Sequence, residues 1–334
     1  MTRPSSIAVV AGALGALLLV AALRQSVLGV MVGSMLSPLP LAMVVFSLGS
    51  AYLPVAVVSG VVTVAVMTGS FPLAGMYLAV DAAPVAILSR LGLAALTAAG
   101  KPVSGAAVGR TVCWLVLVAF AAMVVALAMM AAGTEGTGIE ATLRARLNEM
   151  MPAVPAAATA PEALSQAPTV TGAGLDFAAA RAEMVRAMAG LLPGVAAWDW
   201  CLRAILSAGL GQMMLMKMNL ALWPTPAYRG FAAPQWFFAL FGATAVAAAV
   251  LKDDAGFIAG TAAAILSLPL VLQGLAVVHS AAARVKHRLA WLAGFYVLAL
   301  VTAGISSVML VGLGVMDNFL QIRVRYLAPR TGGE

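Results

Sequence analysis

The most constraining feature of the sequence is a series of long apolar runs with almost no charge. The stretches 7–23 and 111–133, for example, contain no Asp, Glu, Lys or Arg. A helix that crosses the hydrocarbon core of a bilayer needs about 20 predominantly apolar residues, and several runs reach that length. Only 9% of the residues are charged, against about 25% in ordinary soluble domains. The sequence therefore predicts an all-α, polytopic transmembrane bundle, since the alternating segments of about 10 residues that build a β-barrel do not dominate.

Nine apolar segments are candidates to cross the membrane. They are about Ile7–Leu23, Leu28–Gly49, Ala51–Thr68, Pro72–Leu93, Thr111–Gly133, Trp198–Met216, Trp236–Leu251, Gly256–Ser280 and Leu289–Val315. Because the second segment is open to a re-entrant interpretation, we expect about eight or nine helices. Lys and Arg orient the chain by the positive-inside rule, which places the short basic segments Arg90–Arg110, Lys217–Arg229 and Arg284–Arg288 together on the cytoplasmic side.

Composition divides the chain into four parts. These are the N-terminal transmembrane half (1–133), an extramembrane segment (134–192), the C-terminal transmembrane half (193–316) and a polar, basic tail (317–334). The stretch Gly133–Gly190 holds six of the 12 acidic residues and is expected opposite the basic side. The side of the tail stays open, because its arginines favour the cytoplasm whereas the count of spans places it outside.

The extramembrane segment predicts two amphipathic helices around an Ala/Pro-rich linker, Pro152–Gly174. In the first helix, one face carries Ile139, Leu143, Leu147 and Met150. The second helix begins after Asp176, a candidate N-cap, and carries Met184 and Met188 on one face. Two roles are open for this segment: a lid or spacer at the membrane surface, or an arm that docks a partner.

The sequence does not support catalysis. It lacks a His-Glu-x-x-His zinc motif, a Gly-x-Ser-x-Gly nucleophile elbow, a phosphate-binding glycine loop and cysteines with metal spacing. With two histidines and two cysteines in the whole chain, we expect no metal site and no cofactor. The formal charge of +7 is dispersed at helix ends and is explained by membrane orientation, so we expect no nucleic-acid partner.

Asp81 is the most informative single charge. It lies well inside the fourth apolar segment, where a carboxylate is expensive and must face protein or a water-filled cavity. Pro84 interrupts the same helix three residues later. Two roles are open for Asp81: a solute or proton site, or a carboxyl that is hydrogen-bonded to a neighbouring helix.

Prolines break two other apolar segments. Pro38 and Pro40 interrupt the second, and Pro269 interrupts the eighth. Short, proline-broken segments in both halves of a membrane protein indicate a central binding site. Gln273, one turn after Pro269, is a polar side chain inside an apolar segment, expected either to hydrogen-bond between helices or to contact a ligand.

A charged pair is also predicted at the membrane edge. Asp199 and Arg203 are spaced i, i+4 and share a helix face, so two roles are open: an intrahelical ion pair at this edge, or contact with a ligand. The adjacent Trp198 and Trp200 are typical of an interfacial aromatic belt.

Four stretches together resemble the YybS-like family of predicted bacterial membrane proteins, whose function is unknown. They are Ser37-Pro-Leu-Pro-Leu-Ala42, Leu191-Leu-Pro-Gly194, Gln273-Gly-Leu-Ala-Val-Val-His279 and Gly312-Leu-Gly-Val-Met-Asp-Asn-Phe-Leu-Gln-Ile-Arg-Val-Arg325. That family is grouped with the substrate-binding S components of energy-coupling-factor vitamin transporters. The resemblance implies a multi-pass protein of the bacterial inner membrane that binds a solute and works with partner subunits. This chain is longer than a typical S component, and no vitamin-specific motif carries over.

Two functions follow as hypotheses. The first is a solute-binding, transport-related protein with a mid-membrane site around Asp81, Pro38, Pro40, Pro269 and Gln273. Its partners would be the lipid bilayer, an unidentified solute and other membrane subunits. The second is a non-catalytic assembly or structural partner protein. A polar cavity between Asp81 and the Pro38/Pro40 break favours the first, and a packed interior there favours the second.

Overall fold

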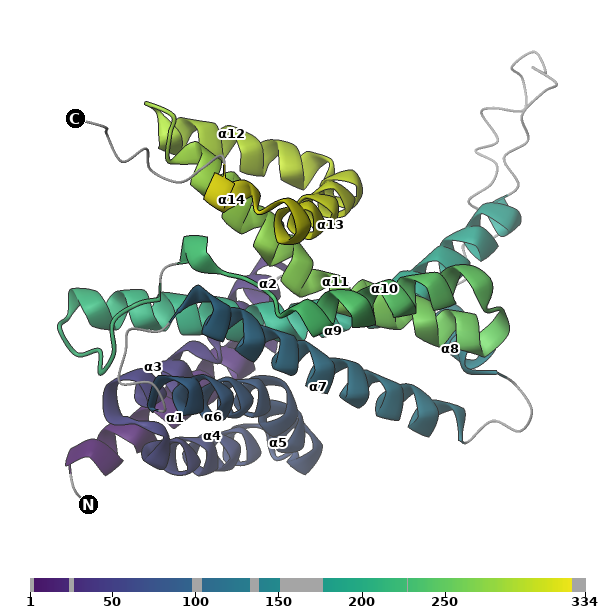
Figure 1. Cartoon of the computed structure of the whole chain (residues 1–334). Coiled ribbons are helices and arrows are strands. Elements are labelled where there is room, and N and C mark those ends of the chain that lie inside the picture. Colours follow the sequence, from purple (N-terminus) through teal and green to yellow (C-terminus); the bar gives the residue numbers. More distant parts are fainter. Residues whose placement is uncertain are drawn as a thin grey trace, which may run out of the picture.

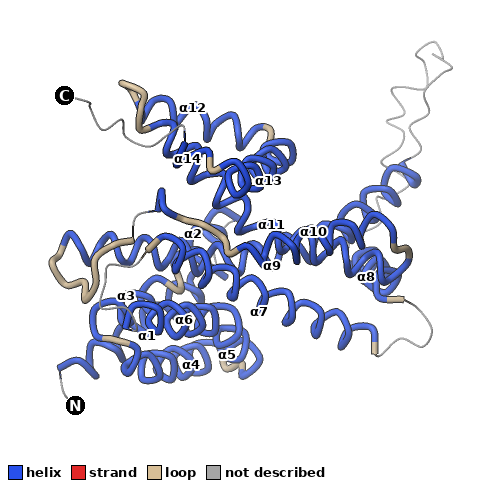
Figure 2. The backbone as a smooth tube through the Cα atoms, in the orientation of Figure 1, coloured by secondary structure: helices blue, strands red, loops and turns tan. Residues whose placement is uncertain are grey.

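The chain is helical throughout its described part. The computed structural model describes residues 3–23, 27–97, 104–132, 138–150, 177–226 and 228–325, and no strand occurs among them. The elements are α1 (Arg3–Leu23), α2 (Val27–Leu36), α3 (Leu39–Leu48), η1 (Ser50–Tyr52), α4 (Leu53–Thr68), α5 (Phe71–Tyr77), η2 (Leu78–Ala82), α6 (Ala83–Thr97), α7 (Gly105–Ala131), α8 (Ile139–Met150), α9 (Phe177–Lys217), η5 (Tyr228–Gly230), α10 (Gln235–Val250), α11 (Asp253–Ala282), α12 (Arg288–Val301), α13 (Ala303–Leu320) and α14 (Ile322–Arg325). Figure 2 shows this helical tube, with short loops between the helices. The predicted all-α bundle is confirmed.

Six helices in the described part are long and apolar enough to cross a membrane. They are Arg3–Leu23, Ser50–Thr68, Phe71–Leu91, Gly105–Ala131, Asp253–Ala282 and Ala303–Leu320. Three shorter apolar helices accompany them, at Val32–Leu48, Gln235–Val250 and Arg288–Val301. Eight of the nine predicted segments overlap these helices. The segment Trp198–Met216, which is part of α9, is helical but is not among them.

Helix α9 is the central element of the molecule. Its 41 residues measure about 60 Å at 1.5 Å per residue, about twice the thickness of the hydrocarbon core. In Figure 1 it runs across the middle, with α1 and α3–α6 below it, α12–α14 above it and α8 near its N-terminal end. Helix α9 also continues through the predicted domain boundary between residues 192 and 193.

The buried apolar side chains form two large clusters. One joins α7, α9, α10 and α11, and the other joins α1, α3, α4 and the α5–α6 segment. Tyr77 is fully buried in the second cluster, where small residues make room for its ring. A Cβ added at Gly60 would lie 2.4 Å from the Tyr77 hydroxyl. The N-terminal half is thus packed around glycines that allow close helix contact.

The second predicted span is broken where the prolines indicated. Helix α2 ends at Leu36, Ser37 and Pro38 form a turn, and α3 begins at Leu39 with Pro40 in its first turn. Proline is tolerated in a first turn because the backbone N–H it lacks has no partner inside the helix. The break therefore ends one helix and starts another.

Pro84 has a milder effect than a break. The chain stays helical from Phe71 to Thr97, but the turn before the proline, Leu78–Ala82, widens to a π-helix that contains Asp81. A π-turn relieves the clash between a proline ring and the preceding carbonyls. The indole of Trp200 donates to Ala79 O in this turn at 3.0 Å.

The predicted break at Pro269 is wrong, since α11 continues through this proline. Pro269 has no N–H to donate to Ile265 O, four residues earlier. In the same turn, Ser267 Oγ donates to Ala264 O at 2.7 Å, and the Trp198 indole donates to the same oxygen at 2.8 Å. Serine side chains and adjacent helices are known to satisfy backbone groups next to a proline inside a membrane helix.

The last predicted span, Leu289–Val315, is two helices instead of one. Helices α12 and α13 are separated at Thr302, whose φ of −107° and ψ of 34° are not helical. In the tail, Arg323 Nη1 donates to the backbone oxygen of Arg229 at 2.6 Å. The described part of the tail therefore lies beside the basic segment Lys217–Arg229, the side that its own arginines favour. Arg330 lies outside the described residues.

Helix α8, which belongs to the segment predicted to lie outside the membrane, is packed against the bundle. Leu143 and Leu147 are buried against α7 and the N-terminal part of α9, whereas Met150 is 79% exposed. Asp254, at the start of α11, accepts hydrogen bonds from the first two backbone N–H groups of α8, at 2.9 and 3.2 Å. Met184 is exposed on α9. The predicted linker and the Asp176 cap lie outside the described residues.

Candidate functional site

Asp81 is the centre of the candidate site. It lies at the middle of the apolar helix Phe71–Leu91, and its side chain is completely shielded from solvent. The π-turn before Pro84 determines the direction of this side chain. An ionisable group so deep in a membrane helix is maintained only by specific partners.

The first partner comes from the break between α2 and α3. Ser37 is fully buried, and its Oγ lies 3.0 Å from both Asp81 Oδ1 and Ser34 O, either of which can accept its single proton. The turn at Pro38 positions this hydroxyl opposite the π-turn. Two interrupted helical segments, predicted separately from their prolines, therefore meet at one carboxylate.

The second partner is Arg203 on α9. Its Nη2 donates to Asp81 Oδ1 at 2.7 Å and to Ser37 Oγ at 3.3 Å, and its Nε donates to Ser34 O at 2.9 Å. The residue is only 5% exposed. We call Ser37, Asp81 and Arg203 the central cluster. It joins α9 to both interrupted segments of the N-terminal half.

The predicted Asp199–Arg203 pair is present but is the weaker of the two pairs that Arg203 makes. Asp199 Oδ2 lies 3.8 Å from Arg203 Nη1, and the Asp199 side chain is 49% exposed. A half-exposed carboxylate is screened by water and contributes little. Arg203 is thus buried in the protein with Asp81 as its main partner, and the predicted pair with Asp199 is its second, longer contact.

One oxygen of the cluster has no partner. Asp81 Oδ2 is buried and accepts no hydrogen bond among the described residues, because Ser37 and Arg203 both contact Oδ1. A buried acceptor without a donor is destabilising by about 1–3 kcal/mol, and more when it is charged. This oxygen is the one chemically unsatisfied atom of the central cluster.

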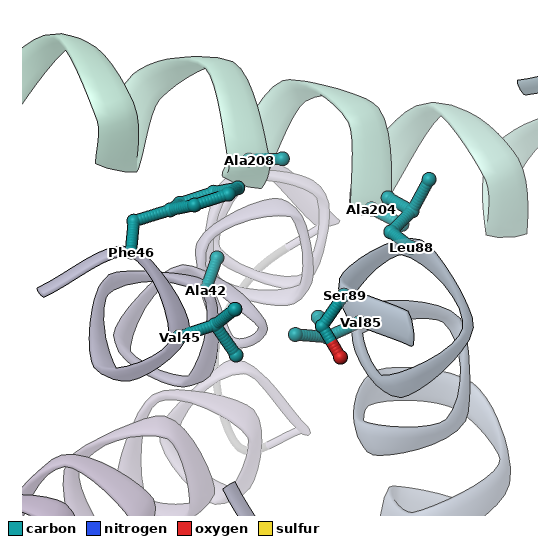
Figure 3. A pocket seen from close by; sticks show the side chains of 8 residues that line it. All are labelled: Ala42, Val45, Phe46, Val85, Leu88, Ser89, Ala204 and Ala208. Carbon is teal, nitrogen blue, oxygen red and sulfur yellow. The ribbon is translucent and has the colours of Figure 1, made fainter. Parts of the chain in front are cut away.

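A small apolar hollow lies next to the central cluster. It has room for about one water molecule and is lined by Ala42, Val45, Phe46, Val85, Leu88, Ser89, Ala204 and Ala208. Figure 3 shows these side chains converging from α3, α6 and α9. Ala204 directly follows Arg203, and Val85 is one turn beyond Asp81. The hollow is thus apolar and adjoins a packed ion pair in which Ser37 and Asp81 are fully buried. Such a packed interior is the outcome that favours an assembly or structural partner protein.

Gln273 belongs to a different group of polar side chains. Its Oε1 accepts from Ala233 N at 2.9 Å, and its Nε2 donates to Asp317 Oδ2 at 3.2 Å. Arg323 donates from Nε to the same carboxylate oxygen at 2.9 Å and from its backbone N to Oδ1 at 3.2 Å. We call Gln273, Asp317 and Arg323 the C-terminal cluster. It connects α11, α13 and the start of the tail.

The five predicted site residues therefore divide into two sets. Asp81 lies at the break formed by Pro38 and Pro40, as predicted. Gln273 hydrogen-bonds between helices within the C-terminal cluster, which was one of its two expected roles. Pro269 is buried in α11, one turn before Gln273.

Ser37, Arg203 and Asp317 were not recognised as members of a site. For Arg203 a signal was present: a single Arg inside one apolar segment and a single Asp inside another are expected to pair, because either charge alone is costly in the bilayer. For Asp317, the Asp…Arg-x-Arg pattern of the last motif contained the pair, but nothing in the sequence indicated the contact with Gln273.

Comparison with known proteins identifies a family without a described activity. No curated protein and no solved structure matches the chain. One family model, described as "Predicted membrane protein (DUF2232)", matches residues 13–318. The match includes both polar clusters except Arg323 and fits the YybS-like resemblance of the four motifs. The chain therefore belongs to the DUF2232 family of predicted membrane proteins.

Proposed function

We propose that this protein is a solute-binding, transport-related protein of the bacterial inner membrane, with its site at the central cluster. One observation supports the proposal most strongly: a buried carboxylate–guanidinium pair lies where the break between α2 and α3 meets the π-turn before Pro84. Transporters commonly place binding sites near the bilayer midplane, at discontinuous helices.

A purely structural role explains the pair less well. Replacing a buried ion pair by apolar residues is often neutral or stabilising, so such a pair is weak evidence for stability. Intramembrane charges instead mark substrate or ion pathways as a rule. The partnerless Oδ2 of Asp81 agrees with this rule, because a purely structural pair gains from bonding both oxygens.

In this proposal the solute binds when the pair separates. Ser34 O, Ser37 Oγ and the two charged groups would then be available to a polar ligand. The S-component resemblance implies a membrane-embedded solute binder that works with partner subunits, which is compatible with this proposal.

The test is ligand-induced thermal stabilisation of the purified full-length protein, measured across vitamins, amino acids and nucleobases. A true ligand raises the melting temperature of the wild type and has no effect on Asp81→Asn. Asp317→Asn, which alters a comparably buried pair in the C-terminal cluster, is the matched control and keeps the response. The proposal fails if no compound stabilises the wild type, or if Asp81→Asn responds normally.

A second function, a non-catalytic membrane assembly partner, is favoured by the close packing at the central cluster and by the helix α8 attached to the bundle. It predicts a stoichiometric partner that co-purifies with the chain and is retained by Asp81→Asn. The double variant Leu143→Ser and Leu147→Ser, which removes the packing of α8, would release that partner. A partner lost with Asp81→Asn instead would return the function to the central cluster.

A further inference from the structure

The central cluster has one unsatisfied oxygen, and this atom is too deeply buried for a water-sized sphere to touch it. Asp81 Oδ2 is completely buried without a donor, and the nearby hollow is apolar. A hydrated ion or an organic cation needs a cavity, whereas a proton needs none. The ligand that fits this atom in the packed state is therefore a proton.

Arg203 has two carboxylates within reach. Nη2 contacts Asp81 at 2.7 Å, and on the other side Nη1 lies 3.8 Å from Asp199, whose side chain is half-exposed. Asp199 precedes Arg203 by one helical turn, toward the end of α9 that packs against α8. It is the acidic group that connects the buried pair to solvent.

We propose that Asp81 binds a proton at Oδ2. Once Asp81 is neutral, the Arg203 guanidinium leaves Asp81 and pairs with Asp199 instead. The inference rests on the proposed function and deepens it, since it makes opening of the site depend on protons. The proton comes from the aqueous phase and neutralises Asp81. Arg203 keeps its charge and pairs with the negative Asp199. The titratable groups that face Asp81 are Arg203 and Asp199 on α9 and Tyr77 on α5, and the break at Ser37 supplies only hydroxyl and backbone groups.

The transfer loosens the contact between α9 and the interrupted helices. In the paired state Arg203 Nε donates to Ser34 O and Nη2 donates to Ser37 Oγ. Movement toward Asp199 breaks both bonds. Trp200, on the same turn of α9, donates to Ala79 O in the π-turn that contains Asp81, so its fluorescence reports the change.

The experiment uses the purified full-length protein in lipid nanodiscs, and the proton itself is the probe. The pH is varied from about 4 to 9, a range that includes both ordinary and shifted pKa values of carboxyl groups. Infrared difference spectra detect the C=O band of a protonated buried carboxyl, and the Trp200 signal is the difference between wild type and Trp200→Phe. We expect both signals in the wild type and in the control Asp317→Asn. Both are expected to be lost in Asp81→Asn.

Asp199→Asn separates the two steps of the proposal. With no second carboxylate for Arg203, the infrared band remains and the Trp200 response disappears. If Asp81→Asn does not fold, the double variant Asp81→Asn/Arg203→Gln removes both charges and takes its place. The proposal is overturned if a folded variant without the Asp81 carboxylate keeps the band, or if the wild type shows no band. A wild type that binds a solute but shows no band would refute this inference alone and leave the proposed function standing.

Discussion

The ion pair between Asp81 and Arg203 permits a quantitative test by a double-mutant cycle. Nη2 and Oδ1 lie 2.7 Å apart, and the two side chains are 7% and 0% exposed. With charge centres about 4 Å apart and an effective dielectric constant of about 20, the attraction is about 4 kcal/mol. Removing one partner leaves the other charge buried and unpaired, which destabilises by about 3–5 kcal/mol.

The cycle consists of Asp81→Asn, Arg203→Gln and the double variant. Each single change is expected to lower the free energy of unfolding by about 3–5 kcal/mol. The double variant buries no charge in the cluster, so its loss is smaller than the sum, with a coupling energy of about 2–3 kcal/mol. The amide that replaces the Asp81 carboxyl has nearly the same shape, so packing is preserved and the cycle reports mainly charge.

The assay is reversible unfolding in mixed micelles by added sodium dodecyl sulfate, followed by far-ultraviolet circular dichroism. Asp317→Asn serves as a reference, because its effect is expected to add to that of Asp81→Asn if the two clusters are independent. If the double variant loses as much unfolding free energy as the two single variants together, the reasoning is refuted, because the two groups then do not act as a pair.

Two further predictions concern packing and capping. Gly60→Ala places a Cβ 2.4 Å from the buried Tyr77 hydroxyl and is expected to lower stability by about 1–3 kcal/mol through overpacking; Gly209→Ala, whose Cβ meets no atom within 4 Å, should leave the same unfolding midpoint unchanged or slightly raised. Asp254→Ala removes both acceptors from the N-terminus of α8, which lowers the stability of this helix by about 1 kcal/mol. Limited proteolysis should then cut α8 faster. An unchanged cleavage rate would show that α8 is held by its apolar face alone.

The features that the sequence predicted well depend on local chemistry. Apolar length predicts a membrane helix because the bilayer leaves few alternatives for the backbone. Pro38 and Pro40 predict a break because a proline lacks the donor that a helix interior needs. Asp81 is recognised from the sequence alone, because the free-energy cost of a charge in the bilayer depends on its depth and not on the identity of its partner.

The features that were missed depend on which helices become neighbours. Pro269 is chemically the same as Pro38, yet α11 stays helical through it, and Ser267 and Trp198 both donate to Ala264 O in the preceding turn. The donor from Trp198 is 66 residues away in the chain, and no local pattern specifies its approach. The two helices α12 and α13 were read as one for a similar reason, since the bend at Thr302 is marked by neither proline nor a run of polar residues.

The contrast between the two clusters is the strongest argument for locating function at the central one. In the C-terminal cluster, Asp317 and Arg323 are six residues apart, and hydrogen bonds reach both carboxylate oxygens. Such a local, satisfied arrangement is what fastening a chain end requires. In the central cluster, Asp81 and Arg203 are 122 residues apart and come from separate helices, yet one oxygen is left without a donor. Apolar side chains would hold these helices together without the desolvation penalty of two buried charges. A charge pair placed at two helix interruptions, and left incompletely satisfied there, is better explained by a change of partner during function than by stability.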